Sequence, residues 1–284
     1  MQIALLGLGA MGARIAARLA DAGYTLTVWN RTPGRAPDLD ARRADTPRDA
    51  ATGADVVLSM VRDDDASRAV WTGADGAFAG MAEGALAVEC STLGVAWARE
   101  WATAAAAAGV AAVDAPVVGS RPHAEKGVLT VLAGGDAEAV ERARPVLGAF
   151  AGAVHHAGPA GTGAAVKLAV NALFAVQAAA LAELLPTLDA LGVPMADAAD
   201  LLNGLPTASP AAQRVAALMP ERAFAPNFPI ELVVKDLGYA VAAAESTGGT
   251  AGVVAAARDA FAQAEARGWG GDDLIGVVQL HERA

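Results

Sequence analysis

The chain has 284 residues, of which 54% are hydrophobic and 18% are charged. This composition is that of a globular protein with one large or two medium domains, and it excludes an intrinsically disordered chain. The formal net charge of -10 excludes an overall basic surface suited to a phosphate backbone, so we expect no nucleic acid partner.

Cys90 is the only cysteine, which excludes an intrachain disulfide and a cysteine-based metal site. It ends the mostly apolar run 85–90, so we predict a buried, inert thiol rather than a reactive one. Residues 1–12 carry no basic start or cleavage site, and we expect a cytoplasmic protein. The nearly uncharged stretch 168–182 is shorter than the ~20 residues that span a bilayer, so we expect a buried helix and no membrane partner.

Short apolar runs alternate with segments of helical periodicity through the first half of the chain. This alternation predicts an α/β domain of the Rossmann type, with a mostly parallel sheet covered on both faces. We expect Asp136 to cap the last helix of this half and Pro145 to bend or end it. The expected strands are 2–6, 25–29, 55–61, 85–90 and 110–113, and the expected helices are 10–22 and 136–150.

Near Gly158 the pattern changes, and only helical segments follow. A long apolar helix is expected over 163–192, bent near Pro186. We therefore predict an α/β domain over 1–160 and an all-α domain over 161–284, joined by the long helix. The shorter helices that we expect after it are 195–202, 210–218, 230–246, 252–267 and 272–283.

A G-x-G-x-x-G motif lies between the first expected strand and the first expected helix, and it consists of Gly7, Leu8, Gly9, Ala10, Met11 and Gly12. The first glycine permits a tight turn, the second lets the backbone approach a pyrophosphate, and the third lets helix and strand pack closely. A pyrophosphate would then lie at the positive end of the helix. The alternative is a glycine-rich turn that binds nothing, and the strand–turn–helix context disfavours it.

The second expected strand ends in Trp29-Asn30-Arg31-Thr32-Pro33. Enzymes that use NAD usually carry Asp or Glu here, which accepts a bond from the 2′-hydroxyl of the adenine ribose. In this chain Arg31 can pair with a 2′-phosphate and Thr32 can donate to it. We therefore predict that Asn30, Arg31 and Thr32 contact NADP and that NADPH is preferred over NADH; the alternative is a solvated loop arginine.

Lys167 and Asn171 lie four residues apart in the long expected helix and therefore project from one face. Their neighbours in the sequence are apolar. Burial would disfavour the ammonium form and bring the lysine pKa toward neutrality, which suits proton transfer. The alternative is a lysine that extends its ammonium group past the helix edge, and composition does not decide between the two.

In these residues and in two further segments the chain resembles the β-hydroxyacid dehydrogenases, which include 3-hydroxyisobutyrate dehydrogenase, tartronate semialdehyde reductase and glyoxylate/succinic semialdehyde reductases. Four blocks carry the resemblance and together span nearly the whole chain. They are the glycine motif 7–12, the segment Asp114-Ala115-Pro116-Val117-Val118-Gly119, the pattern Gly161, Gly163, Lys167, Asn171, and Lys235-Asp236-Leu237 after Phe224 and Phe228.

The resemblance implies an NADP-dependent oxidoreductase that interconverts a small β- or ω-hydroxyacid and its aldehyde by hydride transfer. It implies that Lys167 is the general acid/base and that Asn171 holds the substrate near it. Backbone amides around Val118 and Gly119 would bind the carboxylate of the substrate. Lys235 would line the pocket for both cofactor and substrate.

The resemblance also assigns cofactor contacts to Met60, Val61 and Thr92. It implies that the long helix joins the two domains and supports a homodimer or homotetramer, so that the helical domain serves substrate binding and oligomerisation.

The substrate block departs from the family pattern. Val118 stands where many members have serine, so a hydroxyl bond to the substrate carboxylate is lost while the backbone amide remains. The segment 119–127 is less glycine-rich than usual and looks closer to the glyoxylate/succinic semialdehyde reductase branch. Arg121 within it could assist carboxylate binding, but we favour a surface arginine. The block 91–94 lacks the proline often found nearby.

Two other function classes fit the same fold. Imine reductases share the fold and cofactor but usually carry another residue in place of Lys167. A non-catalytic NADP-binding module would also be expected to lose this lysine. We expect no metal, because the four histidines form no ligand pattern and the sequential His155 and His156 would face opposite sides of a strand.

Overall fold

The structure is a computed structural model that describes residues 1–282. It divides into two compact units, of which the first is Met1–Lys167 and the second begins at Leu168. The domain boundary expected from the sequence, between residues 160 and 161, lies just before helix α7 (Thr162–Ala190), whereas the division into units falls inside that helix.

The first unit is built on a nine-stranded, mostly parallel sheet in the order β3-β2-β1-β4-β5-β6-β8-β7, with β9 paired to β8. The strand order reverses between β1 and β4, and such a switch point is where open α/β sheets bind ligands. β8 runs antiparallel to β6 and β7, and β9 runs parallel to β8, so β8 and β9 both run opposite to the other strands. The strands are β1 (Gln2–Leu6), β2 (Thr25–Trp29), β3 (Arg42–Arg43), β4 (Val56–Ser59), β5 (Leu86–Glu89), β6 (Ala111–Asp114), β7 (Val117–Val118), β8 (Leu129–Gly135) and β9 (Ala151–Gly158).

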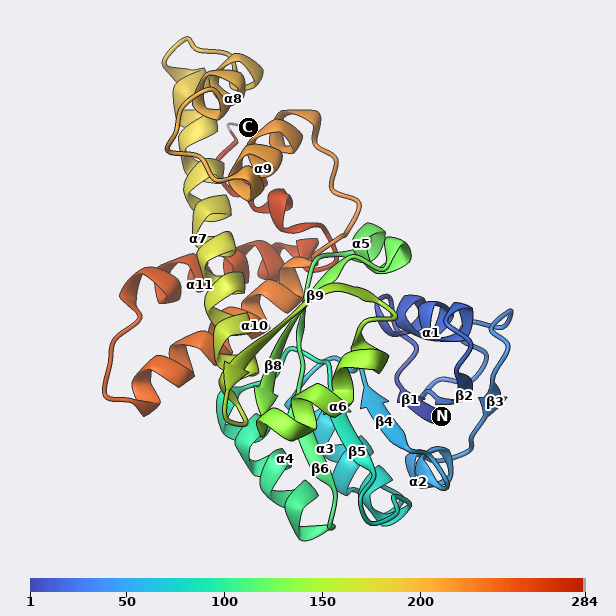
Figure 1. The fold of residues 1–284 in the computed structure, drawn as a ribbon. Coiled ribbons are helices and arrows are strands. Elements are labelled where there is room, and N and C mark those ends of the chain that lie inside the picture. Colours follow the sequence, from blue (N-terminus) through green and yellow to red (C-terminus); the bar gives the residue numbers. More distant parts are fainter. Residues whose placement is uncertain (283–284) are drawn as a thin grey trace. The chain divides into compact units, whose positions relative to one another are not determined.

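Helices cover both faces of this sheet, as the sequence predicted (Figure 1). Side chains of alternate residues point to opposite faces, so Ile3 and Leu5 pack with α1 and α6, while Ala4 and Leu6 pack with α2, α3 and α4. The helices of this unit are α1 (Gly12–Asp21), α2 (Pro47–Ala51), α3 (Asp64–Thr72), α4 (Val95–Ala107), α5 (Arg121–Lys126) and α6 (Ala137–Leu147), with a short 3-10 turn at Ala77–Ala79.

In its described residues the second unit is built of helices joined by loops, with no β-strand. One face of α7 carries small side chains, among them Ala175, Ala178 and Ala182, and these pack into a core with Met219 and Phe261. The prediction of an all-α region after the long helix is therefore confirmed. The elements after α7 are α8 (Met195–Asn203), α9 (Pro210–Glu221), α10 (Ile230–Ser246), α11 (Gly252–Ala264), a π-helical turn (Glu265–Trp269) and a 3-10 turn (Leu274–Leu280).

The last two predicted helices differ from the observed ones. The helix expected over 252–267 is α-helical only to Ala264, because the π-helical turn that follows has Gly268 at φ 91°, outside helical values. The helix expected over 272–283 is a 3-10 turn, and its last residue lies outside the described residues. Asp136 does occupy the N-cap of α6, but its side chain makes no capping bond, and α6 runs past Pro145 to Leu147.

Helix α7 has 29 residues, and its most apolar window has a mean hydropathy of 1.8. Length and composition alone would therefore allow it to cross a membrane, although its uncharged stretch 168–182 is shorter than the ~20 residues that span a bilayer. Buried residues make up 44% of that window, and those from Ala172 onward belong to the core of the second unit. A core helix passes the same test.

Candidate active site

The β1–α1 turn places its three glycines in different surroundings. A Cβ on Gly7, which has φ +101°, would collide with the carbonyl oxygen of Met60, and a Cβ on Gly12 would collide with the carbonyl oxygen of Gly7. A Cβ on Gly9 would meet nothing within 4 Å. Internal packing therefore explains Gly7 and Gly12, whereas Gly9 leaves the open approach that a pyrophosphate requires.

Asn30 joins this turn to the end of β2. The backbone N–H of Leu8 donates to Asn30 Oδ1 at 2.7 Å, and Asn30 Nδ2 donates to the carbonyl oxygen of Thr32 at 2.8 Å. These two partners fix the orientation of the amide, since an N–H needs an acceptor and a carbonyl needs a donor. The side chain predicted to contact the cofactor thus connects two of the segments that are predicted to bind it.

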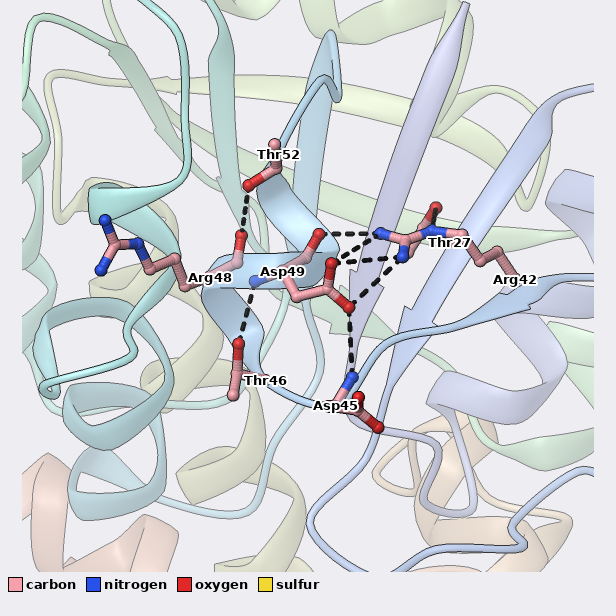
Figure 2. Close-up of polar contacts among 7 residues, drawn as sticks. All are labelled: Thr27, Arg42, Asp45, Thr46, Arg48, Asp49 and Thr52. Atoms are coloured by element: carbon pink, nitrogen blue, oxygen red, sulfur yellow. Dashed lines mark hydrogen bonds and ion pairs between the residues drawn. The ribbon is translucent and has the colours of Figure 1, made fainter.

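The arginines that follow β2 differ in what they bind. Arg42 forms an ion pair with Asp49 at 3.2 Å, and its Nε donates to Thr27 Oγ1, as Figure 2 shows. Arg43 donates to the carbonyl oxygens of Arg35 and Ala36 and so braces the loop 31–41. Arg31 is exposed and forms no hydrogen bond or ion pair with residues 1–282. Its guanidinium is thus available to an anion from solution.

A row of buried polar residues crosses the carboxyl ends of the parallel strands. Ser59, Glu89 and Asp114 are register partners on β4, β5 and β6. They share the sheet face covered by α2, α3 and α4, since the register partners Val57 and Ala87 pack there two residues earlier.

Glu89 ties together the loops that follow β4 and β5. Its carboxylate accepts bonds from Ser67 Oγ at 2.7 Å, from Trp71 Nε1 at 2.8 Å and from the N–H of Ser91 at 2.9 Å. Ser91 Oγ in turn accepts a bond from the N–H of Val61 at 2.8 Å. Two of the predicted cofactor segments, at Met60–Val61 and Ser91–Thr92, are thereby connected. Sequence reasoning missed Glu89, although a charged residue at the end of an apolar run was a visible signal.

Cys90 follows Glu89 and is buried. Burial, together with the neighbouring Glu89 charge, raises the pKa of the thiol far above its ordinary value. A thiol held in the neutral form is a poor nucleophile, which agrees with the predicted inert cysteine.

The predicted substrate loop begins with Asp114 and turns at Gly119. Val118 is half-buried on β7, and Gly119 has φ +119° with no room for a Cβ, which would meet the side chains of Leu129 and His123. Both Val118 and Gly119 are therefore held in place by β8 and by α5. Arg121 is half-buried on α5.

Helix α7 carries the two residues predicted to be catalytic. Lys167 is only 8% exposed, as is Asn171 one turn later. The alternative of a lysine that extends into solvent at the helix edge is therefore not what the structure shows. A buried lysine needs a polar partner or loses its proton, and either state suits a proton donor and acceptor.

In the second unit, the third and fourth sequence blocks meet at Asp236. Asn171 Nδ2 donates to Asp236 Oδ2 at 2.6 Å, and Lys235 Nζ lies 2.7 Å from Asp236 Oδ1. Lys235 and Asp236 form a close ion pair, but the contact does not have the geometry of a hydrogen bond. Lys235 also lies 4.9 Å from the centre of the Tyr239 ring. Asp236 therefore orients Asn171 and Lys235, a role that sequence reasoning did not assign.

Within residues 1–282, no group of three or more His, Cys, Asp or Glu side chains could hold a metal ion. His156 instead uses Nε2 to bond the carbonyl oxygens of Gly135 and Gly158 within the sheet.

Comparison with known proteins gives matches along nearly the whole chain. Residues 2–158 match the family described as the NAD-binding domain of 6-phosphogluconate dehydrogenase, and residues 161–281 match the NAD-binding family of NADP-dependent 3-hydroxyisobutyrate dehydrogenase. A 3-hydroxyisobutyrate dehydrogenase of Pseudomonas aeruginosa is 35% identical, with 93% of each chain covered. An NAD-dependent L-serine dehydrogenase of the same organism is 36% identical, with 87% of this chain and 86% of the relative covered.

Solved structures agree with these relatives. Mycobacterium tuberculosis 3-hydroxyisobutyrate dehydrogenase, solved with L-serine, has a TM-score of 0.90 and 31% identity, and the match covers 98% of both chains. A Streptomyces aurantiacus imine reductase has a lower TM-score of 0.59 at 26% identity, with 100% of both chains covered. The dehydrogenase therefore fits this chain better than this imine reductase does.

The two outer glycines and the middle glycine of the motif are expected to respond differently to alanine. Gly9→Ala should leave the melting temperature unchanged but weaken NADPH binding by ~10-fold or more, since the added methyl meets no protein atom and would collide with a bound pyrophosphate. Gly12→Ala should instead destabilise the protein by about 1–3 kcal/mol through overpacking.

Thermal unfolding and a fluorescence titration with NADPH would measure both variants. A Gly9→Ala protein that binds NADPH like the wild type would contradict the placement of the pyrophosphate at this turn.

Proposed function

This chain belongs to the β-hydroxyacid dehydrogenase family of nicotinamide-dependent oxidoreductases acting on CH–OH groups, and on that premise we propose that it interconverts a small β- or ω-hydroxyacid and its aldehyde with NADP. The observation that carries the proposal is the buried Lys167 on α7, one turn before Asn171. The first unit then serves as the NADP-binding domain, and the helical region binds substrate and a second copy of the chain.

The chemistry follows from the side chains. When bound, the nicotinamide supplies or accepts the hydride. As an aldehyde is reduced, negative charge develops on its oxygen, and the Lys167 ammonium donates a proton to that oxygen. In the reverse direction neutral Lys167 accepts the proton of the alcohol. Asn171, oriented by Asp236, holds the reacting oxygen near the lysine.

The substrate class rests on relatives and on the loop after β6. 3-Hydroxyisobutyrate and L-serine, named for the two relatives above, each carry a carboxylate and a hydroxyl on the β-carbon. In this chain the backbone amides around Val118 and Gly119 bind that carboxylate, and Lys235 lines the pocket for substrate and cofactor. Val118 supplies no hydroxyl, so recognition of the carboxylate depends more on the backbone than in members with serine there.

Reduction of a panel of four aldehydes and one imine tests the proposal. The panel contains glyoxylate, succinic semialdehyde, methylmalonate semialdehyde, tartronate semialdehyde and a cyclic imine, and the loss of NADPH absorbance is followed. Oxidation of 3-hydroxyisobutyrate and L-serine with NADP tests the reverse direction. Turnover of the imine alone would move the chain to the imine reductases, and NADPH binding with no turnover would favour a non-catalytic module.

Lys167→Ala is expected to lower kcat by ~10²-fold or more while NADPH still binds, because the group that donates and accepts the proton is lost. Lys167→Met keeps an apolar side chain in the buried position and should lose as much activity with less effect on folding. Lys126→Ala, on the exposed surface of α5, is the matched control. A Lys167 variant with near wild-type kcat would remove this residue from the proposed role.

Arg31→Ala is expected to weaken NADPH binding by ~10-fold or more and to change NADH binding little, because only NADPH carries the 2′-phosphate. Arg31 is exposed and available, and Asn30 and Thr32 supply no negative charge beside it. Equilibrium titrations with both nucleotides measure the effect, with Arg42→Ala as a control whose guanidinium is bound to Asp49. Equal weakening of both nucleotides would contradict the assignment.

The exposed face of α7 supports the proposed homodimer or homotetramer. Val166, Leu173 and Leu184 are exposed and spaced by seven or eleven residues on α7, so they share one helix face, and Leu191 directly after the helix is exposed as well. Leu173 is 65% exposed and Leu191 is 75% exposed, which is unusual for leucines that stay in contact with water.

Leu173→Glu is expected to shift the protein toward the monomer, because a buried interface would not accept an unpaired carboxylate. Light scattering coupled to size-exclusion chromatography measures the mass, and Ala180→Glu, seven residues later on the same exposed face, should shift the mass in the same direction. A wild-type protein that is monomeric at micromolar concentration would contradict the oligomer.

A further inference from the structure

We propose that Asp114 is a positioning residue that anchors the start of the Lys167 helix and the substrate loop to one point of the sheet. The inference rests on the proposed function, since it assigns a purpose to the geometry around Lys167. It concerns residues of the first unit only.

The contacts of Asp114 are made with the start of α7. Asp114 is the last residue of β6 and is 1% exposed. Its Oδ1 accepts the N–H of Gly161 at 2.7 Å, and its Oδ2 accepts the N–H of Ala164 at 2.8 Å. The first N–H groups of a helix have no partner within the helix, so this carboxylate caps α7 from a distant strand.

The local side chain that could have capped α7 is engaged elsewhere. Thr162 Oγ1 donates to the carbonyl oxygen of Pro159 at 2.6 Å. Asp114 is therefore the side chain that satisfies the N–H groups of Gly161 and Ala164, and losing it leaves two buried donors without a partner.

Two glycines, which lack a Cβ, allow the start of α7 to pack directly against the sheet. A Cβ on Gly163 would collide with the carbonyl oxygens of Leu132 and Asp114, and a Cβ on Gly134 would collide with Asp114 Oδ1. The backbone of α7 thus lies at contact distance from β6 and β8. A shift of the helix start in either direction breaks a hydrogen bond or creates a collision.

Both parts of the proposed site depend on this anchor. Lys167 lies one turn beyond Ala164 on α7, and Val118 and Gly119 follow Asp114 through the buried pair Ala115 and Pro116. One carboxylate therefore sets the position of the proton donor and of the amides that bind the substrate carboxylate. A displacement of about 1 Å in such an arrangement can lower a rate by ~10²-fold.

The surroundings of Asp114 disfavour the charged form of its carboxyl group. Burial is the largest cause that raises its pKa, to about 6; the N–H groups of Gly161 and Ala164 oppose this shift, and the Glu89 charge on β5 adds to it. The charged or titratable groups on the other neighbouring elements include Arg99 on α4, whose side chain reaches Gly161, Lys167 on α7 and His156 on β9; Glu100 and His155 lie on α4 and β9 as well.

The raised pKa of Asp114 determines how the stability of the protein changes with pH. A carboxyl whose folded pKa lies above its ordinary 3.8 contributes stability that is fully present below about pH 4 and is lost as pH rises through about 6. Replacing Asp114 by asparagine removes this contribution. The melting temperature of the wild type minus that of Asp114→Asn should therefore be larger at pH 4.5 than at pH 7.5.

The test compares Asp114→Asn with a cap variant away from the site. Asparagine has the same shape but can accept only one of the two N–H bonds, so kcat should fall about 10-fold while the Kd for NADPH changes less than about 2-fold. Thr46→Ala removes the cap of α2 in the same unit, where Thr46 accepts the N–H of Asp49, and should lower the melting temperature without lowering kcat.

Hydrogen exchange followed by mass spectrometry supplies a readout that needs no substrate. In Asp114→Asn, the peptides covering 115–119 and 161–167 should exchange faster, while in Thr46→Ala only the peptide around 46–52 should do so. Wild-type kcat in Asp114→Asn, or unchanged exchange in both site peptides, would overturn the inference. A wild-type enzyme that is inactive on the whole panel would instead overturn the proposed function, and the exchange result would still decide whether Asp114 is the anchor.

Discussion

The structure depends on the requirement that polar groups buried at the carboxyl ends of the strands find partners. Ser59, Glu89 and Asp114 lie in one row with almost no exposure to water, and an unpaired polar group there would cost about 1–3 kcal/mol. Helix α3, the loop after β5 and the start of α7 supply these partners. The polar row thus determines the shape of the segments that carry the proposed chemistry, while the apolar faces of the sheet determine its stability.

The fold class and most long elements were predictable because their side chains follow one periodicity. Helix α10 runs from Ile230 to Ser246, as predicted, and β1 matches its predicted range. The pattern did not predict β8, which ends in two glycines, or α3, which is short and begins with two aspartates. The 3-10 turn at Leu274–Leu280 was taken for an α-helix, since both place apolar side chains three or four residues apart.

The candidate site was predictable where one segment carries the information. Lys167 and Asn171 stand out as polar residues in an apolar helix, and both are buried. The roles of Glu89, Asp114 and Asp236 were not predictable. Each of them bonds a partner that lies 18 to 65 residues away along the chain. A sequence shows that a charged side chain lies in an apolar run, but only the fold shows which N–H group or side chain it binds.

The amide of Asn30 bears on how cofactor choice can change in such a protein. Its Oδ1 accepts the N–H of Leu8, and an aspartate at this position would retain an oxygen there to accept that bond. The same aspartate would lose the donor to the Thr32 carbonyl oxygen and would place a negative charge beside the position proposed for the 2′-phosphate. At residue 30, the oxygen that supports the glycine turn is common to asparagine and aspartate, whereas the charge that bears on the proposed choice between NADP and NAD differs. A substitution between these two residues can therefore alter the proposed nucleotide preference without rebuilding the glycine turn.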